Sequence, residues 1–488
     1  MQTTLKKAGE LRGAKADLVV VFVASGDGPL EGPAAAADDA LDGLVTASRA
    51  DGEITGEAGS LTVLHTGGRM AAPRVAVVGV GDGGVDRWRA AGRAAGNRAR
   101  ELRAQTVALA PGDADGDRVA AAIVGVEAGA YRFTRYRTGD AGKRPPVRAL
   151  QVLGGGASAA QVKRAANTAT AVSAARVLAD TPSNDMTPTA LAERAEAIAA
   201  GIPGLTAQIL GPRELTRLKA GALLGVAKGS AEPPRMIVLR WTPPKTRRGA
   251  SGEVLGLVGK AVTFDTGGIS IKPSQGMEEM KLDMSGGAAV VEAMGLIAQQ
   301  GVGVEVVGVV PATENMPSGT ATKPGDVVTA MNGKTIEVIN TDAEGRLILA
   351  DALCYATSKA KATRLVDFAT LTGAIVVALG EVYAGLFGSD AEWTEAVRAA
   401  GEAAGDLCWP MPLHEGYAGL ISSKVADLSN SANKRQAGAV YAAQFLREFT
   451  DGRPWCHVDI AGTGMIGGAG TGFGVGLMLN AAEALAAR

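Results

Sequence analysis

The sequence predicts an α/β protein of two domains, and three observations support this prediction. Apolar runs with the spacing of strands alternate with longer runs of helical spacing, the pattern of a sheet covered by helices. The chain has 488 residues, more than one typical domain holds. A flexible run at Gly154–Gly156 divides it, so we expect an N-terminal α/β domain at 1–160 and a larger α/β domain at 161–488.

Composition and charge exclude several classes of protein. A content of 47% hydrophobic and 20% charged residues is typical of a globular enzyme with a full core. The net charge of −1 disfavours nucleic acid as a partner but leaves it open. Three scattered cysteines argue for a reducing compartment and against a disulfide framework. The N-terminus leads into no apolar signal core, so we expect a cytoplasmic protein.

The first third of the chain carries the elements of an α/β domain but no catalytic cluster. His65 stands alone in its strand, which favours a packed or surface residue. The Gly-rich run Gly79–Gly84 lacks the full dinucleotide fingerprint, which favours a turn. The expected strands are Asp17–Val23, Leu61–His65, Arg74–Gly79 and Arg148–Leu153, and the expected helices are Val85–Leu102 and Asp117–Ala130.

After Gly156 the pattern continues into the second domain. A long Ala-rich helix is expected at Ala159–Leu178, and Thr187 is placed to cap a second helix that starts with Pro188. The segment Ile460–Ala482 carries no charge and is long enough to span a bilayer, but its glycines favour a loop. Further strands are expected at Val304–Val310, Arg364–Ala369 and His457–Thr463, and helices at Ala288–Ala298, Leu347–Leu353 and Phe473–Ala486.

The apolar run Val254–Phe264 contains no proline and predicts a central strand. Its single charge, Lys260, is costly to bury unless the amine is paired or uncharged, and a lysine that reaches solvent from the strand end is the alternative. Asp265 follows at the carboxyl end of the strand, where open α/β sheets bind ligands. Lys272 is either an electrophile beside a developing oxyanion or a surface lysine. Asp283 precedes a helix, where a carboxylate is often only a cap.

The stretch Asn340–Leu347 carries the strongest signal. It follows the strand-like run Thr335–Asn340, and in an extended backbone Asp342 and Glu344 would face the same side. Adjacent carboxylates repel, and one or two divalent cations with oxygen ligands remove the repulsion. Arg346 is a fixed cation that could hold an anion beside the metals. A solvated turn is the alternative interpretation.

Three segments together closely resemble the leucyl (cytosol) aminopeptidases, a two-metal peptidase family. They are Val258–Pro273, Lys281–Met284 and Asn340–Leu347. Asn184–Pro188 and Pro317–Asp326 are also similar, so the resemblance covers the region after about residue 165. The chain departs from the commoner pattern at Ala261, at Thr266 and at Gly464–Met465, which leaves the side-chain preference open.

This resemblance implies a fold, an activity and a site. The N-terminal α/β domain would be macro-like, and the C-terminal catalytic domain would have a mixed central sheet flanked by helices. The activity implied is a metal-dependent aminopeptidase that releases N-terminal leucine and other apolar residues from peptides with water activated by two metals. The implied protein is a cytoplasmic homohexamer, a dimer of trimers, with no membrane partner.

The resemblance also implies the role of each site residue. The cofactors would be two divalent ions per subunit, Mn²⁺ or Zn²⁺ with Mg²⁺ or Co²⁺ as alternatives, and bicarbonate held by Arg346. The catalytic residues would be Lys272 and Arg346. The metal ligands would be Lys260, Asp265, Asp283, Asp342 and Glu344, and the substrate pocket would include Met280, Thr370 and Ala461.

Other functions find weaker support in the sequence. A serine hydrolase built on Ser285 lacks the Gly-x-Ser-x-Gly elbow. A phosphate-binding NTPase is disfavoured because alanine follows Gly259–Lys260 where the motif needs Ser or Thr. His414 and Glu415 cannot open a zincin helix because Ala418 stands at the position of the second histidine. A binding protein on this scaffold, including a DNA-binding one, is the non-enzyme alternative.

Overall fold

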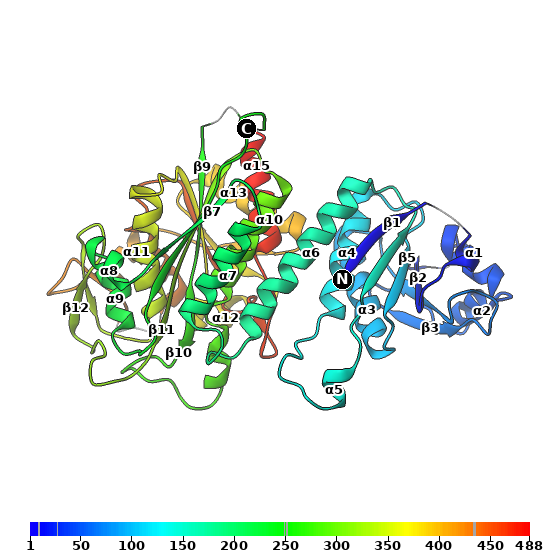
Figure 1. Cartoon of the computed structure of the whole chain (residues 1–488), viewed down its shortest axis with the longest axis horizontal. Helices are drawn as coiled ribbons and strands as arrows, with labels where there is room; N and C mark the ends of the chain where they lie inside the picture. The colour runs from blue at the N-terminus through cyan, green and yellow to red at the C-terminus, as the bar shows by residue number, and fades with distance from the viewer. Residues whose placement is uncertain (8–9, 27, 248, 250–251, 433–435) are drawn as a thin grey trace. The chain divides into compact units, whose positions relative to one another are not determined.

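A computed structural model shows two compact α/β units, Met1–Ser173 and Ala174–Arg488 (Figure 1). It describes all residues except 8–9, 27, 248, 250–251 and 433–435. The division between the units falls inside helix α6 (Ala159–Asp180). The α/β fold class is confirmed, and a functional boundary after residue 160 stays a prediction.

The N-terminal unit is a six-stranded sheet in the order β1-β6-β5-β2-β4-β3. Strand β3 pairs antiparallel with β4, and the other neighbours pair in parallel. The predicted strands and helices form, whereas β1, α1, α2, β5 and α5 were not expected from the sequence. The elements are β1 (Gln2–Lys6), β2 (Leu18–Val23), α1 (Gly32–Ala40), α2 (Leu44–Ala50), β3 (Leu61–His65), β4 (Arg74–Gly79), α3 (Val85–Glu101), β5 (Thr106–Ala110), α4 (Gly116–Ala130), α5 (Asp140–Lys143) and β6 (Ala149–Leu153).

Helices α3 and α4 approach each other more closely than side chains would normally allow. Each carries two glycines one turn apart, Gly92 and Gly96 on α3 and Gly125 and Gly129 on α4. A Cβ atom added to Gly96 would lie 2.2 Å from the carbonyl oxygen of Val126, and the other three positions are equally tight. The absence of side chains therefore lets the two backbones come into contact. Both helices contribute residues to one hydrophobic core of this unit.

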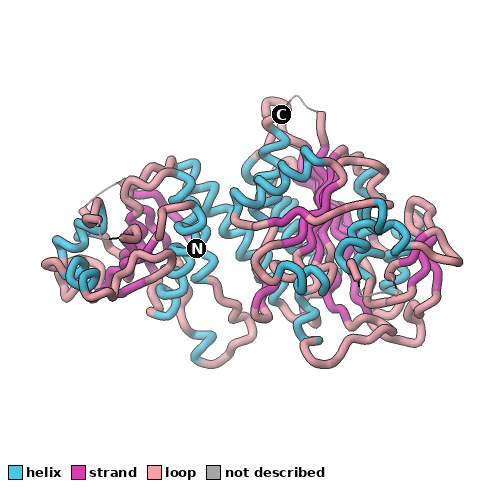
Figure 2. The backbone as a smooth tube through the Cα atoms, turned by 180° about the vertical axis from the view of Figure 1, so that it is seen from behind, coloured by secondary structure: helices cyan, strands magenta, loops and turns pink. Residues whose placement is uncertain are grey.

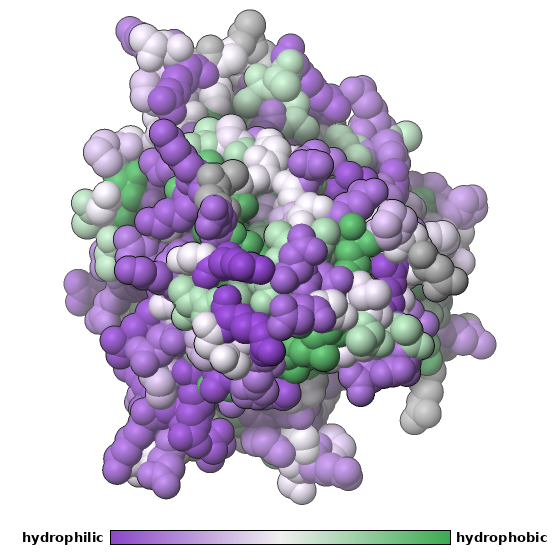
Figure 3. All heavy atoms as spheres, turned by 90° about the vertical axis from the view of Figure 1, so that its right-hand side faces the viewer, coloured by the Kyte–Doolittle hydropathy of each residue, from purple (hydrophilic) through white to green (hydrophobic). Residues whose placement is uncertain are grey.

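The surface of the N-terminal unit is mostly polar on the face drawn in Figure 3. Hydrophilic residues cover most of that face, and hydrophobic ones lie between them in small areas. Among the described residues of this unit, the large hydrophobic side chains that are exposed are Leu44, Val85 and Tyr136. Scattered apolar residues of this kind are ordinary on a folded surface and give no reason to assign a partner here.

The second unit is built on a mixed nine-stranded sheet, as the family resemblance implied. The strand order is β16-β15-β18-β14-β9-β11-β8-β7, with β10 pairing with β11 beyond the end of β9. Strands β9, β11, β14 and β18 run parallel in its centre, and Figure 2 shows helices on both sides of it. The strands are β7 (Leu205–Leu210), β8 (Arg235–Trp241), β9 (Val254–Gly259), β10 (Ala261–Asp265), β11 (Glu305–Asn315), β14 (Arg364–Ala369), β15 (Ala384–Gly388), β16 (Cys408–Pro410) and β18 (Trp455–Asp459).

Two helices that cover opposite faces of the sheet position the site. On one face Val309 packs into the same core as α11 (Glu344–Ser358), and on the other Val310 approaches Gly287 of α10 (Ser285–Gln300). The remaining helices are α7 (Pro188–Ala200), α8 (Pro212–Arg217), α9 (Gly221–Ala227), α12 (Gly373–Leu379), α13 (Ala391–Ala404), α14 (Gly438–Arg447) and α15 (Val475–Ala486). A small sheet joins β12 (Asp326–Thr329), β13 (Thr335–Val338) and β17 (Leu428–Ser429), and β19 (Met465–Ile466) pairs with β20 (Ala469–Gly470).

The structure corrects the prediction of one central strand at Val254–Phe264. The run breaks at Lys260, whose N–H donates to the Phe368 carbonyl while its own carbonyl accepts from the N–H of Gly287. The backbone changes hydrogen-bonding partners there, and an unbroken apolar pattern gives no sign of such a change. Strand β11 also continues to Asn315, past the expected end at Val310.

The uncharged segment Ile460–Ala482 is not a continuous helix. It contains the short β19–β20 hairpin and only the first part of α15. Among the residues that the structure describes, no helix combines the length and the apolar character needed to cross a bilayer.

We predict that Gly96→Ala destabilises the N-terminal unit, because the new methyl group would collide with the Val126 carbonyl. Overpacking of this kind costs about 1–3 kcal/mol of unfolding free energy. Calorimetry should show a lower melting temperature. Gly139→Ala is the control, since nothing lies within 4 Å of a Cβ atom added there. Equal melting temperatures for the two variants would contradict the close helix contact.

Candidate metal centre

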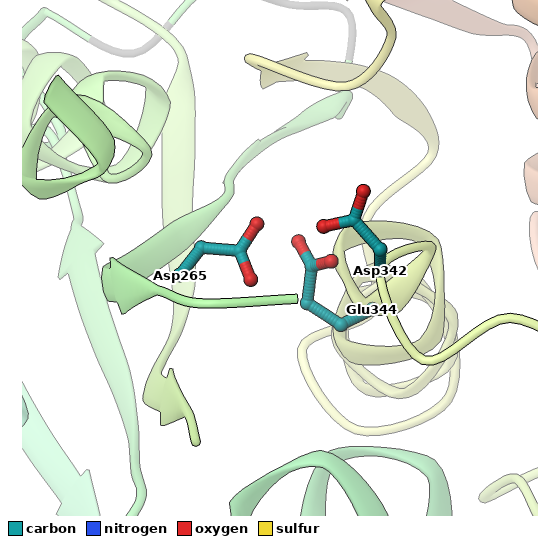
Figure 4. A group of neighbouring side chains, drawn as sticks. All are labelled: Asp265, Asp342 and Glu344. Atoms are coloured by element: carbon teal, nitrogen blue, oxygen red, sulfur yellow. The ribbon is translucent and has the colours of Figure 1, made fainter. Parts of the chain in front are cut away.

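Three carboxylates meet at the carboxyl end of β10 and the start of α11. Asp265 ends β10, Glu344 is the first residue of α11, and Asp342 lies two residues before it. Figure 4 shows the three carboxyl groups pointing toward one another. One oxygen of each lies within 4.8 Å of the others, which is a spacing that one metal ion can bridge.

Two lysines complete the cluster. The Nζ atom of Lys260 lies 2.7 Å from Oδ1 of Asp283 and 2.8 Å from Oε1 of Glu344. The Nζ atom of Lys272 lies 2.6 Å from Oδ2 of Asp265 and also contacts Asp342. Lys260 is only 3% exposed, so the alternative in which it reaches solvent is wrong. The structure therefore brings together six of the residues that the sequence singled out.

The negative charge of this cluster is only partly balanced. When all four acids are ionised, four carboxylates face two ammonium groups, so two negative charges lack a counter-charge within the group. Oδ2 of Asp283 and Oε2 of Glu344 are buried and have no hydrogen-bond partner among the residues that the structure describes. Buried, unpaired carboxylate oxygens are costly, and divalent cations would satisfy them. The residues present thus fit a metal site.

The same imbalance shifts the pKa values of the cluster. Burial, followed by repulsion from Asp265, raises the pKa of Glu344 to about 8. Burial also raises the pKa of Asp283 to about 6, although the charge of Lys260 opposes the shift. Burial alone would lower the pKa of Lys260, but the charges of Asp283 and Glu344 outweigh it and hold the pKa above its usual value. Lys260 is thus a paired ammonium here, one of the two states expected from the sequence.

A second layer of residues orients the carboxylates. Oδ1 of Asp265 accepts from the side-chain amide of Asn315 at 2.8 Å and from the N–H of Gly267 at 2.9 Å. Oδ1 of Asp283 accepts from the hydroxyl of Thr370 at 2.6 Å. The role of Asn315 was not predicted from the sequence. These hydrogen bonds fix Oδ1 of Asp265 and of Asp283, so Oδ2 of each remains for contacts within the cluster.

Gly345 lets Lys260 reach its partners. A Cβ atom added to Gly345 would lie 2.7 Å from Cε and 2.8 Å from Nζ of Lys260. The lysine side chain therefore runs directly across the backbone of the first turn of α11. Any side chain at this position would displace the amine from Glu344.

Arg346 lies deeper in the same helix turn. Its Nη1 donates to the carbonyl of Asn430 at 2.6 Å, and its guanidinium carbon lies 5.2 Å from the centre of the Tyr441 ring. Within the described part of the chain, its buried Nε has no hydrogen-bond partner. Burial lowers the pKa of Arg346 from its usual value. An unpartnered N–H on a buried guanidinium fits a small oxyanion as a ligand.

The structure corrects the backbone argument for Asp342 and Glu344. The two residues are not in an extended strand, because the N–H of Asp342 donates to the side chain of Asn340 in a turn and Glu344 is already helical. Helix α11 thus begins three residues before the predicted Leu347. The carboxylates converge because the turn and the helix start aim them at one point.

The remaining predicted residues lie on nearby segments. Thr370 follows β14, is buried and contacts Asp283. Met280 in the 3-10 helix Met277–Leu282 and Ala461 after β18 are half-buried, and their place in a pocket stays a prediction. The hydroxyl of Ser285 donates to the Leu282 carbonyl at 2.6 Å, an engagement that does not suit a nucleophile.

Comparison with protein families gives two matches that together cover most of the chain. The family model described as cytosol aminopeptidase family, catalytic domain, matches residues 173–479. The model described as cytosol aminopeptidase family, N-terminal domain, matches residues 18–140.

Individual relatives agree with these matches. A probable cytosol aminopeptidase of Solibacter usitatus is 46% identical over 85% of this chain and 86% of its own. One of Rhizobium meliloti is 43% identical over 90% of both chains. Among solved structures, a mutant of tomato leucine aminopeptidase has a TM-score of 0.89 at 32% identity and covers 99% of this chain and 96% of its own. The bottromycin maturation enzyme BotP in complex with Mn has a TM-score of 0.83 at 33% identity, over 96% of this chain and 100% of its own.

We predict that the chelator-treated protein loses stability as the pH rises from 6 to 8. The pKa of Glu344 is raised to about 8, so the folded state holds a proton that the unfolded state releases at lower pH. The free energy of unfolding should fall by about 2–3 kcal/mol over this window, at about 1.4 kcal/mol per pH unit. Urea titrations should show a smaller fall for Glu344→Gln, which cannot ionise. An identical fall in both proteins would assign the titration to other groups.

Proposed function

Because the chain belongs to the cytosol aminopeptidase family and is a metalloaminopeptidase, we propose that it releases N-terminal leucine and other apolar residues from peptides with two divalent metals per subunit. One observation carries the proposal. Four carboxylates converge on two lysines and leave two negative charges and two buried oxygens unsatisfied. Such a site favours binding of divalent cations with hard oxygen ligands.

The proposed metal ligands are the convergent residues themselves. They are Lys260, Asp265, Asp283, Asp342 and Glu344. Lys260 would bind through its uncharged amine, so it must first lose the proton that its carboxylate partners stabilise. Mn²⁺ or Zn²⁺ is the proposed ion, with Mg²⁺ and Co²⁺ as alternatives, and the Mn-bound BotP structure supports manganese. When bound, the pair would lower the pKa of water from near 16 to about 7 and supply a nucleophile at neutral pH.

Lys272 is proposed as the electrophilic catalyst. In this structure its ammonium lies between Asp265 and Asp342, so it already faces the centre of the cluster. Its positive charge would stabilise the negative charge that develops on the carbonyl oxygen of the scissile peptide bond. Burial alone would lower the pKa of Lys272, but Asp265 and the other carboxylates raise it above its usual value, which keeps the amine charged.

Arg346 is proposed to hold bicarbonate, which would serve as the general base for the attacking water. The unpartnered Nε and the buried position of the guanidinium support this role. The fixed contacts to Asn430 and Tyr441 orient the guanidinium plane and so would orient the bound anion. Met280, Thr370 and Ala461 are proposed to line the pocket for the N-terminal side chain and to favour apolar residues.

We also propose a cytoplasmic homohexamer of two trimers. The support for the location is that the relatives are named cytosol aminopeptidases. The support for assembly is the exposure of large apolar side chains on the second unit, among them Val377 at 90%, Val382 at 64% and Trp409 at 55%. Nucleic acid is not a favoured partner at a net charge of −1.

The main rival is a serine hydrolase based on Ser285, and metal removal separates the two. We expect the chelated protein to lose its activity on leucine p-nitroanilide and to regain it with Mn²⁺. Asp342→Ala should contain less metal by elemental analysis and lose more than about 100-fold in activity, because even outer-layer partners of metal ligands cost about 10–100-fold. Asp326→Ala is the control, since Asp326 pairs with Lys323 on the surface. Full activity after complete metal removal would exclude the proposal.

Lys272→Ala tests the electrophilic role. We expect kcat to fall by about 10²–10³, the usual cost of removing one oxyanion donor, with the metal content unchanged. Lys323→Ala is the matched control, because this lysine also pairs with an aspartate but lies exposed in the same unit. An unchanged kcat, measured at saturating substrate, would rule out a catalytic role for Lys272.

A further inference from the structure

Asp459 is a buried carboxylate with no role in the proposed catalysis. It joins two loops at the carboxyl ends of strands β14 and β18. Asp459 ends β18 and is fully buried. Its Oδ1 accepts from the N–H groups of Leu371 at 3.1 Å, Thr372 at 3.4 Å and Ala461 at 3.3 Å. Its Oδ2 accepts from the hydroxyl of Thr372 at 2.7 Å. One side chain thus ties the loop after β14 to the loop after β18.

Both of these loops carry residues assigned to the substrate pocket. Thr370 lies in the first loop, next to Leu371, and Ala461 is itself a partner of Asp459 in the second. Thr370 also connects to the metal cluster, since its carbonyl accepts from Lys260 at 3.0 Å and its hydroxyl donates to Asp283 at 2.6 Å. Asp459 therefore ties the two loops to each other and, through the loop of Thr370, to the cluster.

A histidine–aspartate pair lies near Asp459, with His457 on the same strand, β18, and Asp367 on the neighbouring strand β14. Nδ1 of the fully buried His457 is 2.6 Å from Oδ1 of Asp367, and the indole N–H of Trp455 donates to the other oxygen of Asp367 at 2.6 Å. Burial alone would lower the pKa of His457, but Asp367 and Asp459 raise it above its usual value. Burial raises the pKa of Asp459, and the positive charge of His457 partly opposes that shift.

We propose that Asp459 is a positioning residue that clamps the loops of Thr370 and Ala461 together and so sets the shape of the pocket for the N-terminal side chain of the substrate. The proposal rests on the proposed aminopeptidase function. A side chain that fills the pocket depends on both walls, whereas a methyl group depends on them little. Loss of the clamp should therefore weaken selection of leucine over alanine more than it slows hydrolysis in general.

Asp351 provides a matched comparison. It is also a fully buried carboxylate, and it accepts from the N–H groups of Leu223 at 2.9 Å and Met331 at 2.8 Å. Its two partners lie on segments that carry none of the proposed site residues. A variant at Asp351 thus reports the loss of stability that follows from removing a buried carboxylate, without loosening the loops of Thr370 and Ala461.

The kinetic test compares Asp459→Ala, Asp459→Asn and Asp351→Ala on the p-nitroanilides of leucine and alanine. For Asp459→Ala we expect KM for leucine to rise about tenfold or more, because a displacement near 1 Å can cost about 10²-fold, while KM for alanine changes less than about threefold. Asp459→Asn keeps an acceptor oxygen and should restore the preference. Asp351→Ala should lower the melting temperature and leave the preference unchanged.

Amide hydrogen exchange tests the clamp without any substrate. Peptides that cover 370–373 and 460–463 should exchange about tenfold faster in Asp459→Ala than in the wild type, and at the wild-type rate in Asp351→Ala. Unchanged exchange, an unchanged preference, or the same change in Asp351→Ala would overturn the clamp. A shifted preference that accompanies a halved metal content would also overturn it. An inactive wild type with faster exchange in Asp459→Ala would instead reject the proposed function and keep the clamp.

Discussion

The concentration of buried negative charge at one edge of the central sheet is the constraint on which the rest of the site depends. Asp265, Asp283 and the pair Asp342 and Glu344 come from three segments, and no pair of lysines can neutralise all four carboxylates. A fold that buries such a group without cations loses stability as the acids ionise. The surrounding elements can therefore be understood as a frame that holds mutually repelling groups in place until metal ions balance them.

The frame relies on close backbone contacts more than on large side chains. A Cβ atom added to Gly286 would lie 2.1 Å from the Phe368 carbonyl, so the start of α10 lies directly against β14. This contact brings Asp283, just before α10, to the amine of Lys260. Asn315 and Thr370 then orient the carboxylates by hydrogen bonds from neighbouring strand ends. Helix and sheet are thus packed closely enough to bring these side chains together.

Much of this could be predicted from the sequence, and the limits have physical causes. Asp342 and Glu344 were recognised by their spacing within a specific motif, and the residues of the cluster by their resemblance to a family. The break at Lys260 was missed because it depends on which strand each N–H pairs with, and apolar patterning carries no such information. The hydrogen bonds of Asp459 to Leu371 and Thr372 were missed for a similar reason, since these partners lie 88 and 87 residues away in the chain. Hydrogen bonds between residues far apart in the chain give no signal in the local sequence pattern.

The crossing of Lys260 over Gly345 has a consequence for how this motif can change. The amine reaches Glu344 only along a path that a hydrogen atom leaves free. A shorter residue at 260 would fall short of the carboxylate and leave an empty channel above the helix. A larger residue at 345 would close that channel and expel the lysine. A residue larger than glycine at 345 is therefore expected to be tolerated only where a shorter residue replaces Lys260.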